Sequence, residues 1–258
     1  MSLYQHYREE EHLFVDQVLS WKEQVESTFI YKISDFLNPR EQKIVKQIIG
    51  ETNEDIQVKF FGGNEHTERK RAIIAPFYEI IEEESFELAV LEGRYNAKFL
   101  NLEHRDVMGA FLSLGIDRKK LGDIYVADGM IQIVTSDDLV PFVLANFTSV
   151  KNANIKLQKI SLSKLKVEEA DWKVFERTVP SLRLDAVIKE IYNLSRKDAS
   201  TLIEQGRVQV NHKITEDTAY ALDLEDLISV RGKGRSKLIG ENGLSRKGRN
   251  RITVAILK

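Results

Sequence analysis

Two cations stand where the sequence predicts the start of a helix. Arg196 and Lys197 follow Ser195, a suitable N-cap, and Asp198 makes a variant of the capping box. Gly206 supplies a left-handed stop. Cations in a first turn oppose the helix dipole and cost about 0.3–1 kcal/mol each when exposed. Backbone N–H groups beside two cations suit a phosphate, so we predict contact with a nucleic-acid backbone; a tolerated surface cost is the alternative.

Basic side chains are concentrated in the C-terminal third of the chain. The whole chain has a formal net charge of −2, yet residues 1–75 carry −3 and residues 161–258 carry +5. Residues 231–251 hold eight Lys and Arg against the single acid Glu241. One-sided charge of this kind is typical of a surface that binds a polyanion. A solvated basic tail is the alternative interpretation.

The residues that would support catalysis or metal binding are missing or badly spaced. The chain has no cysteine, which excludes disulfides, cysteine nucleophiles and cysteine-based zinc sites. No Walker A motif occurs, and Gly232 and Gly234 give only G-x-G. The five histidines lack metal-ligand spacing, and His104-Arg105-Asp106 fits the start of a helix. We expect no catalytic residue, no metal and no cofactor.

The sequence also predicts the compartment. The start, MSLYQHYREEEHLF, is acidic where a signal peptide would be basic and then apolar. No apolar run approaches the ~20 residues of a membrane span. We therefore expect a soluble cytoplasmic protein with no membrane partner.

Shifts of pattern near Pro76 and Pro180 predict an α+β protein of three domains. We expect a mainly helical N-terminal domain with a short β-pair over 1–75 and a middle domain over 76–162. A polar linker should follow over 163–180. A C-terminal domain with a basic extension should occupy 181–258.

The N-terminal domain has a clear helix-start signal. Asn38 can cap a helix, Pro39 suits its first position and Glu41 can reach back as in a capping box. The segments IQVKFF and RAIIAPF are expected to pair as strands. The charged loop between them ends in Arg69, Lys70 and Arg71, and it is expected to be solvated, with contact to nucleic acid or a partner as the alternative.

The middle domain has the order β-α-β-β-α-β, which predicts a ferredoxin-like sandwich with one sheet face free of helices. Asp128-Gly129 suits a type I′ hairpin turn. That turn pairs Ile124 with Ile133 and Tyr125 with Gln132. RNA-recognition modules share this layout and stack bases on the open face. Tyr125 could stack in this way, although an ordinary sheet position is the stronger interpretation. The run 118–120, Arg-Lys-Lys, could meet phosphate or form a solvated turn.

A specific motif pattern follows in the last third. The segment RLDAVIKEIYNLSRKDASTLIEQGRVQVNHKITEDTAYALDLEDLISV resembles an S4 RNA-binding domain. The family pattern is an RLD start, an SR-x-x-A helix, an I-x-x-G-x-V turn, a V-N-G-K hairpin and a G-D-x-I-x-V strand. His212 and Glu225 replace two turn glycines of that pattern. Asp185 lies in the RLD of this helix, so it is expected to be structural rather than catalytic.

The S4 resemblance and the basic run together define a predicted RNA-binding set. Its members are polar or basic residues of the domain or of the run that follows it. They are Arg183, Ser195, Arg196, Lys197, Arg207, Asn211, Lys213, Arg231, Lys233, Arg235 and Lys237.

The chain as a whole resembles the YlmH-type proteins of Gram-positive bacteria and plastids. The segments FLNPREQ, FFGGNEHTERKRAIIAPF and LEHRDVMGAFLSLGIDRKKLGDIYV support this resemblance along with the S4 segment. It implies a non-catalytic protein that binds structured RNA, ribosomal RNA or tRNA on the large ribosomal subunit, with a role in ribosome quality control and a link to cell division. An RNA-modifying enzyme with an unrecognised middle-domain site is one alternative. A division-linked interaction protein is the other.

Overall fold

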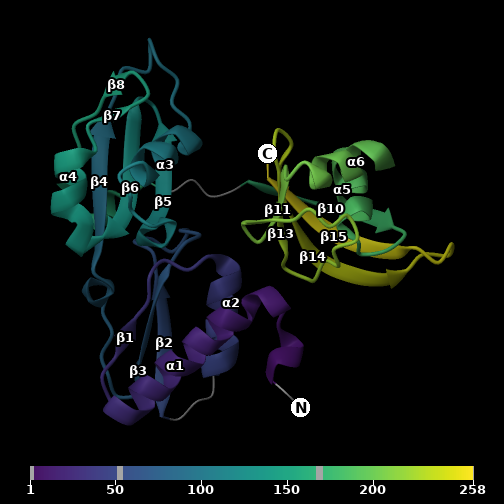
Figure 1. The fold of residues 1–258 in the computed structure, drawn as a ribbon, viewed down its shortest axis with the longest axis horizontal. Coiled ribbons are helices and arrows are strands. Elements are labelled where there is room, and N and C mark those ends of the chain that lie inside the picture. The colour runs from purple at the N-terminus through teal and green to yellow at the C-terminus, as the bar shows by residue number, and fades with distance from the viewer. Residues whose placement is uncertain (1–2, 51–54, 167–170, 258) are drawn as a thin grey trace. The chain divides into compact units, whose positions relative to one another are not determined.

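The computed structural model describes residues 3–50, 55–166 and 171–257. The chain divides into two compact units, Met1–Glu168 and Glu169–Lys258, which are described separately below. Both units contain helices and strands (Figure 1), which confirms the predicted α+β class. None of the described helices has the length and apolar character needed to cross a membrane.

The first unit begins with two helices that pack on a small sheet. Its elements are η1 (Leu3–His6), η2 (Glu9–Glu11), α1 (His12–Thr28), β1 (Lys32–Ile33), α2 (Pro39–Ile49), β2 (Ile56–Phe61) and β3 (Arg71–Pro76). The strand order is β1-β3-β2, and β3 is antiparallel to both neighbours. The predicted pairing of the two strand segments is confirmed.

The predicted helix start at Asn38 is confirmed in detail. The Asn38 side chain accepts a hydrogen bond from the Glu41 N–H at 3.0 Å, and the Glu41 carboxylate accepts one from the Asn38 N–H at 2.7 Å. Pro39 begins the helix, and Gly50 follows its last residue with a φ of +84°. Ile44 and Val45 on the inner face pack against α1 and the sheet.

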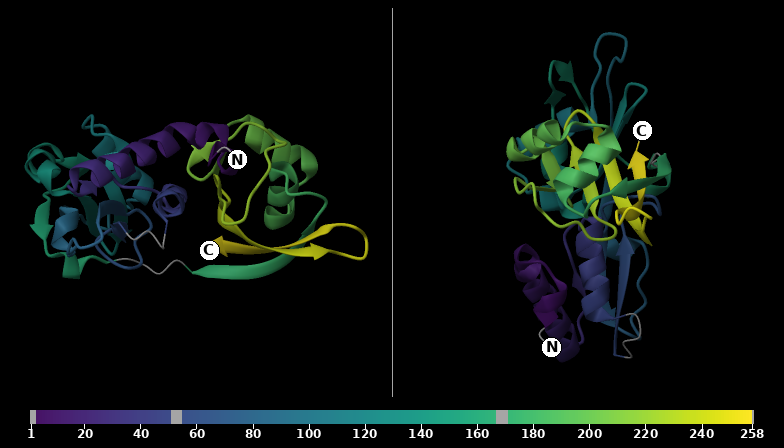
Figure 2. Two further views of the ribbon diagram at one scale, coloured as in Figure 1. Left: turned by 90° about the horizontal axis from the view of Figure 1, so that it is seen from below. Right: turned by 90° about the vertical axis from the view of Figure 1, so that its right-hand side faces the viewer.

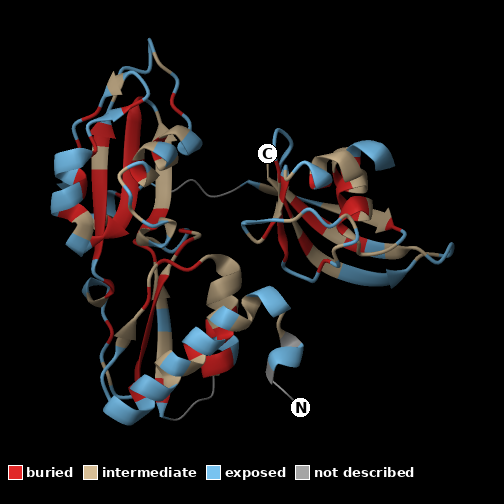
Figure 3. Ribbon diagram, in the orientation of Figure 1, coloured by how far each residue is buried: buried red, intermediate tan, exposed pale blue. Residues whose placement is uncertain are grey.

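A four-stranded sheet with two helices on one face completes the first unit. Its elements are η3 (Glu84–Phe86), β4 (Leu88–Arg94), α3 (His104–Leu112), η4 (Arg118–Lys120), β5 (Leu121–Ala127), β6 (Met130–Ser136), η5 (Asp137–Leu139), α4 (Val140–Asn146), β7 (Ser149–Val150), β8 (Ala153–Asn154), β9 (Gln158–Ile160) and η6 (Leu162–Lys164). The strand order β5-β6-β4-β9 is that of a ferredoxin-like fold. Strands β4 and β6 are largely buried (Figure 3).

The predicted register of the β5–β6 hairpin is also confirmed. Ile124 pairs with Ile133 and Tyr125 pairs with Gln132. Asp128 and Gly129 both have positive φ, +54° and +74°, as a type I′ turn requires.

The other face of this sheet is not open, which corrects the expectation of a free platform for bases. Val90 and Val134 on that face pack against Phe36 and Leu165 in a shared core. Gln132 is 1 % exposed, and it bonds to the Lys164 carbonyl and the Lys166 N–H. The N-terminal elements and the segment after β9 therefore cover the face on which Tyr125 lies.

The charged loop before β3 is not solvated, because its arginines are buried at the junction of the two halves of this unit. Arg69 donates to the carbonyls of Leu121 (3.0 Å) and Phe36 (2.7 Å). Arg71 donates to the carbonyls of Ser34 and Phe86, each at 2.8 Å. A guanidinium group holds its N–H donors in a rigid planar fork, so it can bond to carbonyls of two segments in a fixed geometry, whereas the donors of a lysine ammonium rotate.

The second unit is a six-stranded sheet with two helices on one face (Figure 2). Its elements are β10 (Trp172–Val179), α5 (Leu184–Tyr192), α6 (Arg196–Glu204), β11 (Val208–Val210), β12 (Lys213–Ile214), β13 (Leu227–Val230), β14 (Gly234–Leu244) and β15 (Asn250–Leu257). The strand order is β10-β15-β14-β13-β11-β12. Val187, Ile188 and Ile203 of the helices meet Ile252 and Val254 of β15 in its core.

Two expectations for this region were wrong. The predicted linker over 163–180 contains β10, whose eight residues pair antiparallel with β15. The basic run over 231–251 is not a tail or an extension, because most of it forms β14, the start of β15 and the turns beside them. The first error arises because β10 pairs with β15, a partner distant in sequence, and such pairing leaves no local signal. The basic run pairs with its neighbours in the chain, β13 with β14 and β14 with β15, so there the basic composition hid a local strand signal.

Candidate nucleic-acid interface

The start of α6 has the predicted N-cap at Ser195 but not the predicted capping-box bond from Asp198. The Ser195 hydroxyl accepts a hydrogen bond from the Asp198 N–H at 3.0 Å and lies 2.8 Å from an Asp198 carboxylate oxygen. Asp198 therefore bonds to the capping hydroxyl and not to the Ser195 backbone. Arg196 and Lys197 are exposed in the first turn. The helix ends before Gly206, which has a φ of +63° as predicted.

Arg183 lies in an ion pair with a buried carboxylate. Its guanidinium donates to the two oxygens of Asp185 at 3.0 and 3.1 Å, and Asp185 is 4 % exposed. Burial opposes ionisation of Asp185, but the hydrogen bonds from Arg183 and the nearby charge of Arg196 hold its pKa below the ordinary value. The charge of Arg196 thus acts on Asp185, the partner of Arg183. We call Arg183, Ser195, Arg196 and Lys197 the helix-start group.

A second set of cations lies at one end of the sheet. The Arg231 N–H donates to the Arg207 carbonyl at 2.9 Å, so these two residues are neighbours. Lys233 follows in the same turn, between Gly232 and Gly234, which both have positive φ. All three basic side chains are exposed. Arg207, Arg231 and Lys233 form the sheet-end group.

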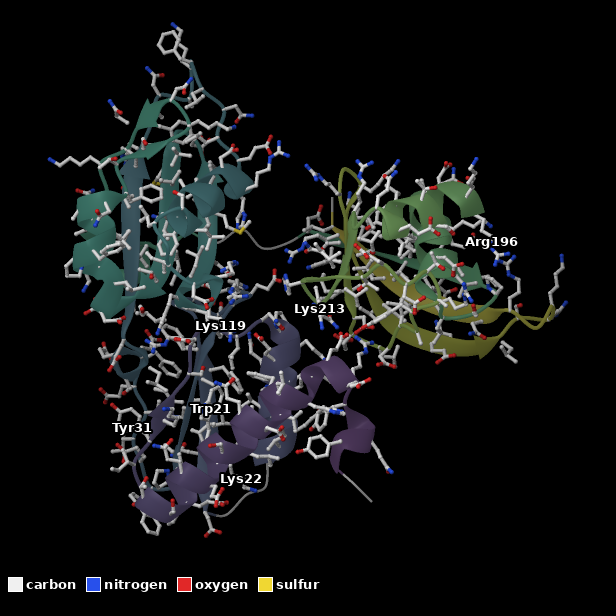
Figure 4. The ribbon with its side chains drawn as sticks, viewed as in Figure 1. Trp21, Lys22, Tyr31, Lys119, Arg196 and Lys213 are labelled. Carbon is white, nitrogen blue, oxygen red and sulfur yellow. The ribbon has the colours of Figure 1, made fainter. Side chains whose placement is uncertain are left out.

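Asn211 has a different environment from the exposed members of the set. Its amide donates to the buried Asp226 carboxylate at 2.8 Å and accepts from the Leu227 N–H at 3.0 Å. The second Asp226 oxygen accepts from the Asp223 N–H at 2.8 Å. Asn211 therefore connects the β11–β12 turn to the loop before β13. Lys213, which follows the same turn, is exposed and lies on the other side of the unit from Arg196 (Figure 4).

Arg235 and Lys237 lie on the sheet face opposite the helices. They pair in register with Leu257 and Ala255 of β15. The Lys237 ammonium lies 5.5 Å from the centre of the Trp172 ring, a cation–π contact across the sheet. Trp172 was missed at the sequence level. The signal that could have found it is the run 172–179, WKVFERTV, which is rich in aromatic and β-branched residues.

The two glycine replacements of the S4 pattern keep the backbone shape of glycine. His212 has a φ of +69° and Glu225 a φ of +72°. Asn211 before His212 is also left-handed, at +50°, so the pair makes a tight hairpin turn. The turn geometry is therefore retained at the expense of two strained side-chain-bearing residues.

The basic run before β5 in the first unit is largely engaged within the fold. Arg118 donates to the Leu121 carbonyl at 2.6 Å, and burial together with the charge of Arg69 lowers its pKa to about 10. Lys120 forms an ion pair with Asp35 at 2.6 Å. Lys119 is exposed.

His104-Arg105-Asp106 forms a helix start, as its sequence predicted. Asp106 accepts from the Glu103 N–H at 2.9 Å and pairs with Lys151 at 2.6 Å. Hydrogen bonds from Lys151 and from the Glu103 backbone lower the pKa of Asp106. Among the residues that the structure describes, no group of three or more His, Asp and Glu has a metal-binding arrangement.

Three family models match consecutive parts of the chain. Residues 10–79 match "YlmH, N-terminal", residues 82–164 match "Putative RNA-binding domain in YlmH" and residues 182–228 match "S4 domain". The S4 match ends before β14, so the strands β10, β14 and β15 lie outside it.

Two relatives agree with these matches. A Bacillus subtilis (strain 168) protein, Ribosome-associated protein quality control protein P2, is 40% identical over 251 residues, which cover 97% of each chain. The solved structure of cell division protein ylmH from Streptococcus pneumoniae is 25% identical with a TM-score of 0.54, and covers 64% of this chain and 100% of that one. The domain matches and the near full-length identity agree, and the chain belongs to the YlmH family of proteins with a C-terminal S4 domain.

Proposed function

We propose that this protein is a non-catalytic, ribosome-associated RNA-binding factor that grips structured RNA through the helix-start group. The observation that supports this most directly is the pair of exposed cations, Arg196 and Lys197, in the first turn of α6. An isolated helix is stabilised by acids at that position, so the arrangement makes sense if it serves a phosphate. The YlmH and S4 matches point to the same class of ligand.

The proposed RNA ligand and cellular location are inferred from the relatives. The name of the Bacillus subtilis relative supports a role on the ribosome in quality control. We propose ribosomal RNA or tRNA on the large subunit as the ligand, which would place the protein in the cytoplasm. The sheet-end group and Lys213 would extend the contact along the RNA backbone, while Asn211 would hold the turn that presents Lys213.

Salt dependence of RNA affinity tests the electrostatic part of the proposal. If about six phosphates of single-stranded RNA are neutralised, log K should fall against log salt with a slope near −4. A slope near zero for the full chain would rule out a phosphate grip by these cations.

Arg196→Ala tests the helix-start group itself. A charge-assisted hydrogen bond contributes about 1.5–3 kcal/mol, so we expect a tenfold to hundredfold loss of RNA affinity with little change in melting temperature. Lys247→Ala removes an exposed cation of the same unit and is the matched control. Equal losses in both variants would mean that net charge, and not the helix start, governs binding.

The non-catalytic part has its own test. Purified protein incubated with ribosomal RNA, tRNA and common methyl donors or nucleotides should leave every nucleoside unchanged by mass spectrometry. One new modified nucleoside would favour the alternative, an RNA-modifying enzyme, and the segment 104–106 would be the first place to search.

A further inference from the structure

Large apolar side chains are exposed together at one end of the first unit. Phe29, which follows α1, is 65 % exposed, and Phe77, which follows β3, is 64 % exposed. Ile30, Tyr31, Tyr78 and Ile80 of the same two segments are also exposed. The exposed end of α1 is visible in Figure 3. Grouped aromatic exposure of this kind marks an interaction site more often than a neutral surface.

A cavity of about 310 Å³ lies among these side chains. Val25, Ile56 and Pro76 form its apolar part, and the rings of Phe29, Phe77 and Tyr78 line the rest. Phe77 and Tyr78 meet edge to face, with their ring centres 5.3 Å apart. Ligand pockets have volumes of about 300–1,000 Å³, so this one fits a single large side chain.

The segment that follows β3 is held in place by hydrogen bonds to Asp55 and Gln57. The Gln57 amide donates to the carbonyls of Pro76 (3.1 Å), Phe77 (3.1 Å) and Glu79 (2.7 Å). The Phe77 N–H donates to the Asp55 carbonyl at 2.9 Å. The aromatic wall is therefore formed before any ligand arrives, which lowers the entropy lost on binding.

Phe29 adds a strained backbone to the same site. It ends α1 in the left-handed region with a φ of +57°, where glycine is the usual residue. A bulky side chain there is costly, and its ring remains mostly in solvent. Strain retained at an exposed aromatic residue is typical of a binding site.

The charges around the cavity select its occupant. Among the described residues that line it are the acids Glu26 and Asp55, and none of these lining residues is Lys, Arg or His. The chain that follows the aromatic wall adds Glu79, whose carbonyl accepts from the Gln57 amide, and Lys22 of the same helix lies 3.8 Å from Glu26. A nucleic-acid backbone or an anionic membrane would be repelled here. A second copy docked through the same face would bring two acidic rims together.

We propose that this cavity is a docking site for a lysine- and arginine-rich segment of a partner protein, which inserts one apolar side chain between Phe29, Phe77 and Tyr78. The carboxylates of the rim would attract the flanking cations and set the partner's charge, while the pocket would select the anchor side chain. All of these residues belong to the first unit, so the proposal does not depend on RNA binding by the second.

The test uses the full-length protein and short fluorescent peptides of the form Lys-Arg-Xaa-Lys-Arg, with Xaa as Trp, Phe, Leu or Ser. Fluorescence anisotropy should give saturable binding for at least one apolar anchor, at least tenfold tighter than for the serine peptide. The acidic peptide Glu-Asp-Trp-Asp-Glu should bind at least tenfold more weakly than its basic counterpart. Methyl resonances of Val25 and Ile56 should shift on binding, which locates the peptide in the cavity.

Variants separate the pocket from general attraction. The double change Phe77→Ser with Tyr78→Ser should lower the affinity for the apolar basic peptide at least tenfold. Phe99→Ser removes another exposed phenylalanine of the same unit and should change nothing. Glu26→Lys should weaken the basic peptide and favour the acidic one. Circular dichroism melting checks that each variant is folded.

The remaining outcomes overturn the proposal. They include no binding by any apolar basic peptide, equal binding of the serine peptide, and full affinity in the double variant. Loss of decauridine binding in the double variant would assign the site to RNA. A concentration-dependent dimer in sedimentation that the double variant abolishes would assign it to a second copy.

Discussion

The arginines of the two units have opposite environments although their local sequences look alike. Arg69 and Arg71 end a charged loop and are less than a tenth exposed, with their guanidinium groups bonded to carbonyls from three segments of the first unit. Arg196 and Arg231 lie in equally charged stretches of the second unit and are exposed. A basic run can therefore join two halves of a fold or face a polyanion. The number and placement of nearby carbonyls decide between these roles.

The largest expected effect is the loss of stability when a buried arginine of the first unit is replaced. Arg69→Ala leaves the Phe36 carbonyl without its guanidinium donor and removes a cation that acts on the half-buried Asp123, whose pKa burial already raises. We expect a loss of about 3 kcal/mol in the free energy of unfolding, measured by urea denaturation. RNA affinity of the folded protein should be unchanged.

Lys70→Ala is the neighbouring control for that change. Among the residues that the structure describes, its ammonium bonds only to the Glu65 carbonyl, and its loss should cost no more than about 0.5 kcal/mol. If Arg69→Ala keeps its stability but loses RNA affinity, the contrast between the two units is wrong.

Asn211→Ala sharpens the comparison inside the second unit. The change leaves the buried Asp226 without its amide donor, so we expect a loss of about 1–3 kcal/mol in stability by thermal melting. Well below the melting temperature, RNA affinity should stay within about twofold of the original. A stable variant with much weaker RNA binding would instead make Asn211 a direct RNA contact.

Ser195→Ala separates the cap from the cations that follow it. Loss of the hydroxyl that accepts from the Asp198 N–H should destabilise the unit by about 1 kcal/mol. Ser195→Asp, which retains a capping acceptor, should restore the stability. An unchanged melting temperature in the alanine variant would show that α6 does not depend on its cap.

The smallest expected effect is an increase in stability. His212→Gly and Glu225→Gly remove the backbone strain of two left-handed residues, which costs about 1–2 kcal/mol each. Part of this gain is offset because glycine loses more conformational entropy on folding. We expect each change to raise stability by about 0.5–1 kcal/mol. A fall in the denaturation midpoint would mean that these side chains make contacts worth more than the strain.

Local patterns predicted several elements whose deciding interactions are local. The Asp128-Gly129 turn set a register that the structure repeats pair for pair, and the Asn38 cap and the Gly206 stop are present. The strand β10 was taken for a linker because its partner β15 lies more than seventy residues away in the chain. The covered sheet face at Gln132 likewise depends on a segment that returns from elsewhere.

The same limit applies to the candidate site. The composition of the S4 segment located the exposed cations of α6, because a cap and a charged first turn are contiguous in sequence. The internal bonds of Asn211 with Asp226 and of Arg183 with Asp185 could not be read from residue types alone. A residue can occupy a motif position because it binds a ligand or because it bonds to a buried neighbour. Only the folded structure shows which neighbours are buried.

The pairing of β10 with β15 has a consequence for the time at which this protein becomes active. Strand β15 lies between β10 and β14, so the sheet that supports α5 and α6 cannot close until the chain has been synthesised to residue 257. Closing such a long-range pair is slow compared with forming a helix. A chain made only as far as β14 would therefore present α6 without its complete supporting sheet, and RNA binding would develop only after β15 has been synthesised.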